Sequence, residues 1–290
     1  MIKGRVIKGV TSKYLVDTPD GVMTCLARGK LKQEGNILIG DFVELTEEKS
    51  GCVIEKVLPR KNSLIRPYVA NVDVCFIVIA PLPAPDFKLV DKIIINALDN
   101  DIKPVLILNK EDLTDNAFKD AVLADYTDAL EIAVTSAKTG GGIDNLLSYA
   151  SGKVACLAGQ SAVGKSSLLN FILGGEVLET GGLSAKIERG RHTTRQSVII
   201  KTGGAYIIDT CGFSMLEFPP DFKPDKLASF YPEFGEYAVH CKFRAGCTHT
   251  AEPDCMIKQA VAEGRISNGR YTRYVELYNQ LLDKWRRRYD

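Results

Sequence analysis

The segment from Gly159 to Ser166 constrains the fold of this chain more than any other part of the sequence. It reads GQSAVGKS, which fits the phosphate-loop pattern G-x-x-x-x-G-K-[ST]. An apolar run, KVACLAG, leads into it, and a helical run, KSSLLNFIL, follows it. In this strand, loop and helix context, backbone N–H groups and a helix N-terminus face phosphate oxygens. The segment therefore predicts a phosphate-binding site between a strand and a helix.

Apolar strands alternate with helices on both sides of this loop, from about residue 70 onward. Strands are expected at VDVCFIVIA, KPVLILNK, EIAVTS, KVACLAG, QSVIIKT and AYIIDT, with helices near 88–99, 116–127 and 143–149 and from Lys165. Such alternation predicts a mostly parallel sheet covered by helices. Ligands of such a sheet bind at the carboxyl ends of its strands.

Within the loop, the residue types predict which side chains contact the phosphates and which contacts magnesium. Lys165 is expected to reach the β- and γ-phosphates, and Ser166 is expected to coordinate magnesium. The other predicted contacts to the nucleotide phosphates come from Gly159, Ser161, Ala162, Val163, Gly164 and Ser167. The loop alone does not distinguish ATP from GTP, so an ATP-dependent kinase is an alternative at this stage.

Two further strand ends supply residues that can read a guanine base. The first reads NKED, in which the Asp112 carboxylate can accept from guanine N1–H and the exocyclic amine, a donor pair that adenine lacks. Asn109 would hold the segment and contact the base, and the stem of Lys110 would lie along its face. The second strand end reads TSAK and is expected to contact the base through Ser136, Ala137 and Lys138. Together they predict GTP as the ligand.

The γ-phosphate and magnesium are expected to meet two later segments. Asp209, at the end of AYIIDT, would hold magnesium through water, and the Gly212 amide would sense the γ-phosphate. One of Thr193 and Thr194 would close on magnesium and γ-phosphate in the GTP state. The sequence does not select between the two threonines, and we assign Thr194 to the magnesium.

Hydrolysis requires an oriented water molecule, and many GTPases use a glutamine directly after this glycine. Phe213 occupies that position and cannot hydrogen-bond water, which predicts slow intrinsic turnover and a partner that completes the site. His192 is the nearest polar candidate for positioning the water, and a structural or phosphate-contacting role is the alternative. The predicted catalytic set is therefore Lys165, His192, Thr193 and Thr194.

The order of these motifs is rotated, because the guanine reader precedes the phosphate loop. In the usual order the phosphate loop comes first. Since domain termini often lie close together, a rotated chain can still build the same site. The segment after Asp209 then leaves the nucleotide site directly, so a change of nucleotide is expected to move whatever follows Gly212.

The N-terminal 66 residues have a different pattern. Five short strands are expected, at RVIKGV, KYLVD, GVMTCLA, ILIGDFVEL and CVIEKVL, which favours a small barrel of the OB-fold type. Twelve basic and eight acidic side chains give this segment a net charge of +4, which is compatible with an RNA-binding face or with an ordinary solvated surface.

The C-terminal segment carries a candidate metal site. Cys241, Cys247, His249 and Cys255 supply three thiolates and an imidazole, the ligand set of a closed, structural zinc site. The last helix, expected over 270–288, has an apolar stripe typical of packing, with arginines elsewhere. We expect domains at 1–66, 67–220 and 221–290.

Bulk composition limits the location and the partners. The net charge is +1, so any attraction to nucleic acid must come from local patches. The N-terminus lacks an apolar run of signal-peptide length, and the longest apolar stretch is too short to span a bilayer. We expect a cytoplasmic protein without membrane contact, and a monomer by default.

The motifs together resemble the RsgA (YjeQ) family of small-subunit-dependent GTPases. The resemblance covers nearly the whole chain and is carried by NKED, TSAKTG, GQSAVGKSSLLN, GRHTT, DTCGF and CKFRAGCTHTAEPDC. It implies an OB barrel, a circularly permuted GTPase domain and a zinc domain. It also implies a role in late maturation of the small ribosomal subunit, with contact to its rRNA and with GTP hydrolysis stimulated by that subunit, and a water-positioning role for His192.

Two positions depart from the family pattern. Ala162 replaces the usual inner glycine of the phosphate loop, and five residues separate Cys241 from Cys247, one more than usual, so a bulge is expected there. The competing hypothesis is a GTP-switched RNA-binding module with negligible catalysis, which Phe213 and the basic barrel favour.

Overall fold

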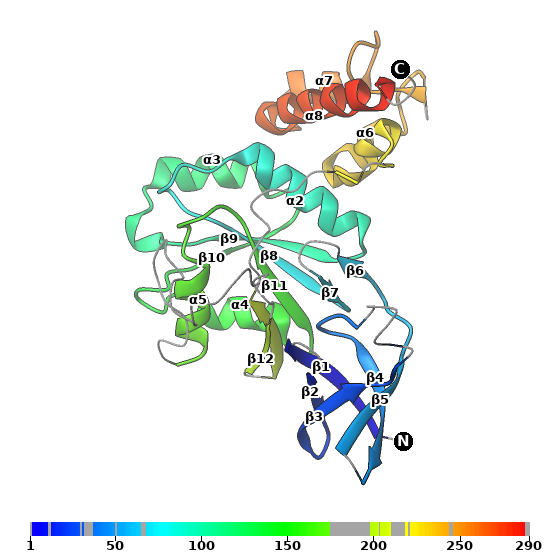
Figure 1. Ribbon diagram of the computed structural model, residues 1–290. Coiled ribbons are helices and arrows are strands. Elements are labelled where there is room, and N and C mark those ends of the chain that lie inside the picture. Colours follow the sequence, from blue (N-terminus) through cyan, green and yellow to red (C-terminus); the bar gives the residue numbers. More distant parts are fainter. Residues whose placement is uncertain are drawn as a thin grey trace.

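The computed structural model describes the chain at residues 2–10, 13–29, 31, 37–49, 51–64, 68–174, 198–202, 204–209, 218–219, 221–243 and 246–287. Three parts follow one another along the chain: a barrel, a sheet with helices on both faces, and a group of helices and loops (Figure 1). The barrel and the C-terminal helices lie at opposite ends of the view in Figure 1. In the described part of the chain, no helix combines the length and the apolarity needed to cross a membrane.

The N-terminal part is a closed five-stranded barrel, as the sequence predicted. Its strands run in the order β1-β2-β3-β5-β4, with β1 at Ile2–Val10, β2 at Lys13–Thr18, β3 at Gly21–Ala27, β4 at Phe42–Glu48 and β5 at Gly51–Val57. Inward-facing side chains alternate with outward-facing ones along each strand, as the period of two requires. The barrel core consists of Val6, Val16, Cys25, Val43, Leu45, Cys52 and Ile54.

The fourth strand begins later than expected. The prediction of one continuous strand over ILIGDFVEL is wrong, because β4 starts at Phe42. Gly40 has φ of +95°, and a Cβ there would lie 2.1 Å from the carbonyl oxygen of Ala70. Asp41 then turns inward, where its two carboxylate oxygens accept from Arg60 at 2.7 and 2.8 Å. The chain therefore bends at Gly40 to meet the segment that leaves the barrel.

The central part is a six-stranded sheet in the order β10-β9-β8-β11-β13-β12. Only β12 is antiparallel to its neighbour, which confirms the mostly parallel sheet. The strands are β8 at Val74–Ile79, β9 at Lys103–Leu108, β10 at Glu131–Val134, β11 at Val154–Ala158, β12 at Val198–Thr202 and β13 at Ala205–Asp209. A two-stranded ribbon, β6 (Ser63–Leu64) with β7 (Val69–Ala70), joins barrel and sheet.

Helices cover both faces of the sheet (Figure 1). They are α2 at Phe87–Asp99, α3 at Asn116–Tyr126, α4 at Ile143–Ala150 and α5 at Lys165–Ile172. One core joins Ile77 of β8 to α2 and α3, and the other joins Phe76 of the same strand to α4 and α5. Because successive strand side chains point to opposite faces, the apolar run in β8 supplies both cores.

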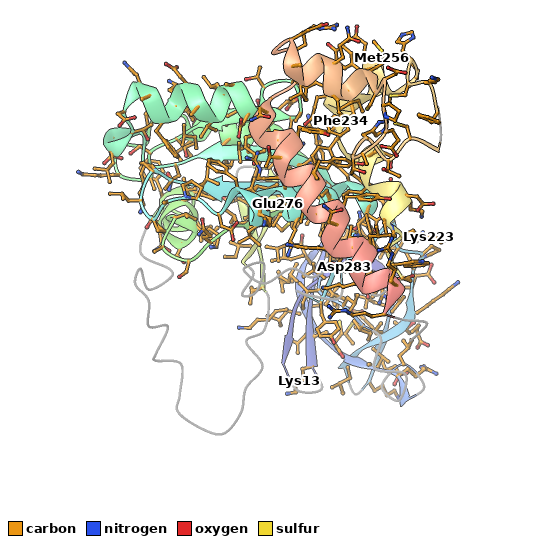
Figure 2. All side chains as sticks on the ribbon, turned by 90° about the horizontal axis from the view of Figure 1, so that it is seen from above. Lys13, Lys223, Phe234, Met256, Glu276 and Asp283 are labelled. Atoms are coloured by element: carbon orange, nitrogen blue, oxygen red, sulfur yellow. The ribbon has the colours of Figure 1, made fainter. Side chains whose placement is uncertain are left out.

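The C-terminal part lies against α2 and α3. It contains the 3-10 helices η2 (Pro224–Phe230) and η3 (Pro232–Phe234) and the helices α6 (Gly235–Ala238), α7 (Met256–Ala262) and α8 (Asn268–Arg286). Seen from above, α8 crosses the molecule with Glu276 near its middle and Asp283 toward its end (Figure 2). Tyr274 and Leu281 of the expected packing stripe on α8 are buried, and Leu277, which was not part of that stripe, is buried as well.

Buried charges hold α8 to the central part, which the sequence did not indicate. Arg270 and Asp91 of α2 are 1% and 0% exposed, and Arg270 Nη1 lies 2.5 Å from Asp91 Oδ1. Arg273 donates to the other Asp91 oxygen at 2.6 Å and lies 3.1 Å from Asp125 of α3. Glu233 of η3 accepts from Arg270 Nε at 2.8 Å. Arg270 therefore falls within the buried stripe, because carboxylates from two other elements, Asp91 and Glu233, compensate its charge.

Candidate nucleotide and metal sites

The predicted phosphate loop connects β11 to α5, with Lys165 as the first residue of the helix. Gly159 has φ of +124°, and a Cβ there would lie 2.2 Å from the Val78 carbonyl oxygen in β8. Gly164 has φ of +98°, and a Cβ there would lie 2.4 Å from Asn109 Nδ2. Both positions of the motif therefore require glycine for conformation and for space.

The lysine and serine residues of the loop lie at its junction with α5. Lys165 Nζ donates to the Gly159 carbonyl at 2.7 Å and also to the Gln160 carbonyl, so its ammonium lies within the curve of the loop. Ser166 and Ser167, both half-buried, occupy the first turn of α5. Ser161 and Ala162 are exposed on the loop. Backbone N–H groups of such a first turn have no partner within the helix and can bind an anion.

Ala162, at the position expected to be glycine, has a backbone conformation that favours glycine. Its φ is +64°, in the left-handed region, which costs an alanine some backbone strain. Its carbonyl accepts from Lys110 Nζ at 2.8 Å, and the same ammonium donates to the Leu82 carbonyl at 2.7 Å.

Asn109 joins three strand ends. It follows β9, and its Nδ2 donates to the Val163 carbonyl of the phosphate loop at 2.9 Å. Its Oδ1 accepts from the Thr135 hydroxyl at 3.2 Å and from the Ala137 backbone N–H at 3.3 Å, at the end of β10. The guanine reader, the second base loop and the phosphate loop therefore lie together at the carboxyl edge of the sheet.

Asp112 is held in its charged form by the second base loop. It lies in the 3-10 helix η1 at Glu111–Leu113, after Lys110 has turned the chain with φ of +60°. The Ser136 hydroxyl donates to Asp112 Oδ1 at 2.7 Å, and Lys138 Nζ lies 3.7 Å from Oδ2. The hydrogen bond from Ser136, with the nearby Lys138 charge, lowers the pKa of Asp112. The structure thus places Asp112, the predicted reader of guanine, beside Ser136 and Lys138 of the second base loop, with its carboxylate ionised.

Two polar residues support this site without having been assigned to it. Thr135 is buried and orients the Asn109 amide. The position of Thr135 next to Ser136 in the TSAK segment could have indicated in the sequence that Thr135 belongs to the site. Gln160 accepts from the Asp86 backbone N–H at 2.8 Å, and Asp86 caps α2. Gln160 occupies a variable position of the motif, so nothing in the sequence indicated that its side chain reaches α2.

The remaining predicted residues are only partly within the described structure. Asp209 ends β13, with its backbone paired to Val198 of β12. The residues His192, Thr193, Thr194 and Gly212 lie outside the described residues. The magnesium set of Ser166, Thr194 and Asp209 and the catalytic role of His192 therefore stay predictions.

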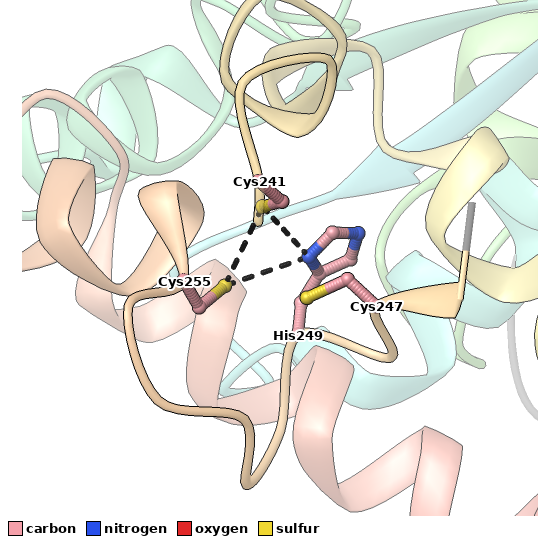
Figure 3. A group of neighbouring side chains, drawn as sticks. All are labelled: Cys241, Cys247, His249 and Cys255. Carbon is pink, nitrogen blue, oxygen red and sulfur yellow. Dashed lines mark hydrogen bonds between the residues drawn. The ribbon is translucent and has the colours of Figure 1, made fainter. Parts of the chain in front are cut away.

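Four ligand-type side chains converge in the C-terminal part (Figure 3). Cys241, Cys247, His249 and Cys255 are buried, and their ligand atoms all lie within 4.8 Å of one another. Cys241 Sγ and Cys255 Sγ lie 3.6 and 3.5 Å from His249 Nδ1, and 3.9 Å from each other. Tetrahedral zinc, with Zn–S near ~2.3 Å and Zn–N near ~2.0 Å, would separate its ligands by about 3.8 Å (S to S) and about 3.5 Å (S to N). The spacing fits zinc, and Cys241 reaches the site across the longer segment before Cys247.

Neighbouring groups fix the histidine of this cluster. Tyr271 donates to the His249 carbonyl at 2.9 Å, and Tyr274 donates to the Thr248 carbonyl at 2.6 Å, both from α8. Burial lowers the pKa of His249, which favours the neutral imidazole that ligates metals. The cluster is thereby attached to the helix that also contacts α2.

Comparison with known proteins gives matches over almost the whole chain. The RsgA N-terminal domain family matches residues 3–53, and the RsgA GTPase family matches residues 57–219. A protein of Caldanaerobacter subterraneus subsp. tengcongensis, named small ribosomal subunit biogenesis GTPase RsgA, is 42% identical, with 99% of this chain and 98% of that protein covered. A protein of the same name from Clostridium kluyveri is 38% identical, with 98% and 99% covered.

Solved structures show the same architecture. The crystal structure of YjeQ from Thermotoga maritima has a TM-score of 0.82 and 36% identity, covering 97% of this chain and 98% of that one. YloQ, described as a circularly permuted GTPase, has a TM-score of 0.81 and 31% identity, covering 98% and 96%. The rotated motif order is therefore shared with a solved relative.

Proposed function

The chain belongs to the RsgA GTPase family, and from this premise we propose that it hydrolyses GTP to GDP and phosphate on the small ribosomal subunit, assisting late maturation of that subunit. The observation that carries the proposal is the hydrogen bond from Asn109 to Val163, which joins a guanine reader to a phosphate loop. A site with both elements selects the base and holds the triphosphate. A kinase that uses ATP would not need the reader.

In this proposal different charged residues bind the base and the phosphates of the nucleotide. The Asp112 carboxylate accepts from guanine, and its lowered pKa keeps it an acceptor at neutral pH. Lys165, at the start of α5, exchanges its present contacts to loop carbonyls for phosphate oxygens. Ser166, Thr194 and Asp209 would hold magnesium, which neutralises charge on the phosphates.

Hydrolysis is expected to depend on a partner. Phe213 stands where many GTPases carry the water-orienting glutamine. We assign the orientation of water to His192, placed for this role only when the subunit is bound. Intrinsic turnover is then slow and subunit-bound turnover fast.

We propose that the barrel binds rRNA and that the C-terminal metal site has a structural role. The barrel, within 1–66, would contact rRNA, and 67–220 would form the GTPase domain. The zinc domain, within 221–290, would contain a structural zinc site, since four protein ligands leave no open position for water. These ligands are Cys241, Cys247, His249 and Cys255. We propose a cytoplasmic monomer.

The decisive experiment compares GTP turnover of the full chain alone, with purified small subunits, and with large subunits as a control. We expect stimulation by small subunits of at least about tenfold, and none by large subunits. Lys165→Ala should abolish turnover in every condition. Turnover unchanged by small subunits would instead support the GTP-switched binding module.

A further inference from the structure

One of the contacts between the barrel and the central sheet is made by a hairpin of β12 and β13. Tyr206 of β13 donates from its hydroxyl to Asp17 Oδ2 at 2.7 Å, and Lys201 of β12 donates to the same oxygen at 3.1 Å. Lys201 and Tyr206 are direct partners across the hairpin. The Asp17 side chain, in β2, is only 12% exposed. One barrel carboxylate thus binds both strands of the hairpin.

An arginine completes this contact. Arg5 of β1 is the cross-strand partner of Asp17. Its guanidinium carbon lies 4.2 Å from the ring centroid of Phe42 in the barrel and 4.9 Å from that of Tyr206. The cation is therefore in contact with one ring from each part of the protein. We call Arg5, Asp17, Lys201 and Tyr206 the barrel joint.

Charge and burial make the barrel joint specific. Burial by itself would raise the pKa of Asp17, but the hydrogen bonds from Tyr206 and Lys201 lower it. Burial raises the pKa of Tyr206, so its hydroxyl stays a donor at neutral pH. Because each group needs its partner across the boundary, the joint holds one arrangement of barrel and hairpin in preference to others.

The opposite end of the same hairpin lies at the nucleotide site. Asp209 is three residues beyond Tyr206 on β13, which is about 10 Å along a strand. Val198, its partner, begins β12 directly after the segment that contains the predicted switch threonines. Strand β13 also pairs with β11, which leads into the phosphate loop. A shift of the hairpin at Tyr206 is therefore transmitted over a short, hydrogen-bonded distance.

We propose that the barrel joint carries the stimulation of GTP hydrolysis from the barrel to Asp209, with Tyr206 as the positioning residue. This inference rests on the proposed function, in which the barrel contacts rRNA. Binding of RNA to the barrel alters the arrangement at Asp17, the hairpin follows, and the strand end that precedes Gly212 takes its active position.

This route differs from the covalent one through the segment after Asp209. The C-terminal part follows β13 in the chain, whereas the barrel is joined by the chain to β8 and contacts β13 through side chains. A single side-chain change at Tyr206 can therefore break this contact with β13 and leave the residues of the nucleotide site unchanged.

The test uses the full chain with Tyr206→Phe, which keeps the ring beside Arg5 and removes only the donor to Asp17. Tyr14→Phe, in the same barrel but outside the joint, is the matched control. GTP turnover is measured alone and with saturating small subunits, together with GDP affinity and co-sedimentation with the subunit. We expect Tyr206→Phe to keep intrinsic turnover, GDP affinity and subunit binding, and to reduce the stimulation factor roughly five- to tenfold.

A second variant guards against a folding defect. Asp17→Asn should reduce stimulation similarly, and the double variant should lose little more, because both changes break one contact. Full stimulation of Tyr206→Phe and Asp17→Asn would overturn the barrel joint and leave the proposed function intact. Absence of stimulation in the unaltered protein would overturn the proposed function, and the joint with it.

Discussion

Asn109 Nδ2 lies 2.9 Å from the carbonyl oxygen of Val163, and this one hydrogen bond connects segments that are 54 residues apart. In the sequence the guanine reader comes first and the phosphate loop later. In the structure β9 and β11 lie on either side of β8, and their carboxyl ends share one edge. The rotated motif order therefore changes the connections between strands and still brings the guanine reader to the phosphate loop.

Removing this connection should weaken nucleotide binding. Asn109→Ala deletes the donor to Val163 and the acceptor for Thr135 and Ala137, so the reader and the loop lose their common support. We expect GDP affinity to fall by at least about tenfold, since a buried polar group left without its hydrogen-bond partner costs about 1–3 kcal/mol. Titration with a fluorescent GDP analogue measures it. Asn100→Ala, at the end of α2, is the control and should bind normally.

The buried charges beside α8 should matter more for stability than exposed pairs. Asp91→Asn leaves Arg270 and Arg273 without their shared carboxylate, which should cost about 3–5 kcal/mol. Trp285 in α8 is the only tryptophan of the chain, so its fluorescence follows urea unfolding of this part. Lys103→Gln, which breaks a pair with Glu131 in which both side chains are 47% exposed, should change stability by less than about 1 kcal/mol. Equal effects of the two variants would contradict this account.

The zinc assignment predicts stoichiometry as well as stability. Metal analysis of the purified protein should give one zinc per chain, and Cys255→Ser should lose it because four ligands are needed to close the tetrahedron. Loss of the metal should also loosen α8, since Tyr271 and Tyr274 bind the cluster backbone. Cys25→Ala, in the barrel, should keep its zinc. Full zinc content in Cys255→Ser would show that the cluster is not the site.

The pH dependence of nucleotide binding should follow Asp112. Its lowered pKa means that the carboxylate stays ionised as the pH falls from 8 to about 5, so Asp112 should add no pH dependence to GDP affinity there beyond that of the nucleotide phosphate. The affinity should decline only when the pH falls through the lowered pKa, where protonation removes the acceptor. Ser136→Ala removes the main cause of the shift, so the decline should begin at higher pH. Identical profiles for the two proteins would contradict this role of Ser136.

The sequence predicted the elements around the site well, because its signals there are local. The phosphate loop, NKED and TSAK each combine a strand end with a fixed spacing of residue types, and parallel strands bring such ends to one edge. The four candidate metal ligands were equally visible, since they lie within a short segment. The fold class and the place of the candidate site at the carboxyl edge of the sheet could therefore be predicted from the sequence.

Contacts between distant segments could not be derived in this way. Arg270 was expected outside the packing stripe of α8, since helical periodicity counts arginine as polar and does not show that Asp91 lies opposite. Tyr206 looked like an ordinary strand residue, although its hydroxyl binds Asp17 in the barrel. Gly40 ended a strand that the apolar pattern continued, because the Ala70 carbonyl passes too close for a side chain. In each case the deciding partner is remote in sequence.

The central claim is that the segment Asn109 to Asp112, although it precedes the phosphate loop in the chain, reads the guanine base of the nucleotide held by that loop. The direct test measures the affinities of Asp112→Asn for GDP and for xanthosine diphosphate. Because the asparagine amide can donate to the xanthine oxygen that replaces the guanine amine, we expect GDP affinity to fall by at least about a hundredfold and xanthosine diphosphate affinity to rise. Unchanged GDP affinity in Asp112→Asn would contradict the claim.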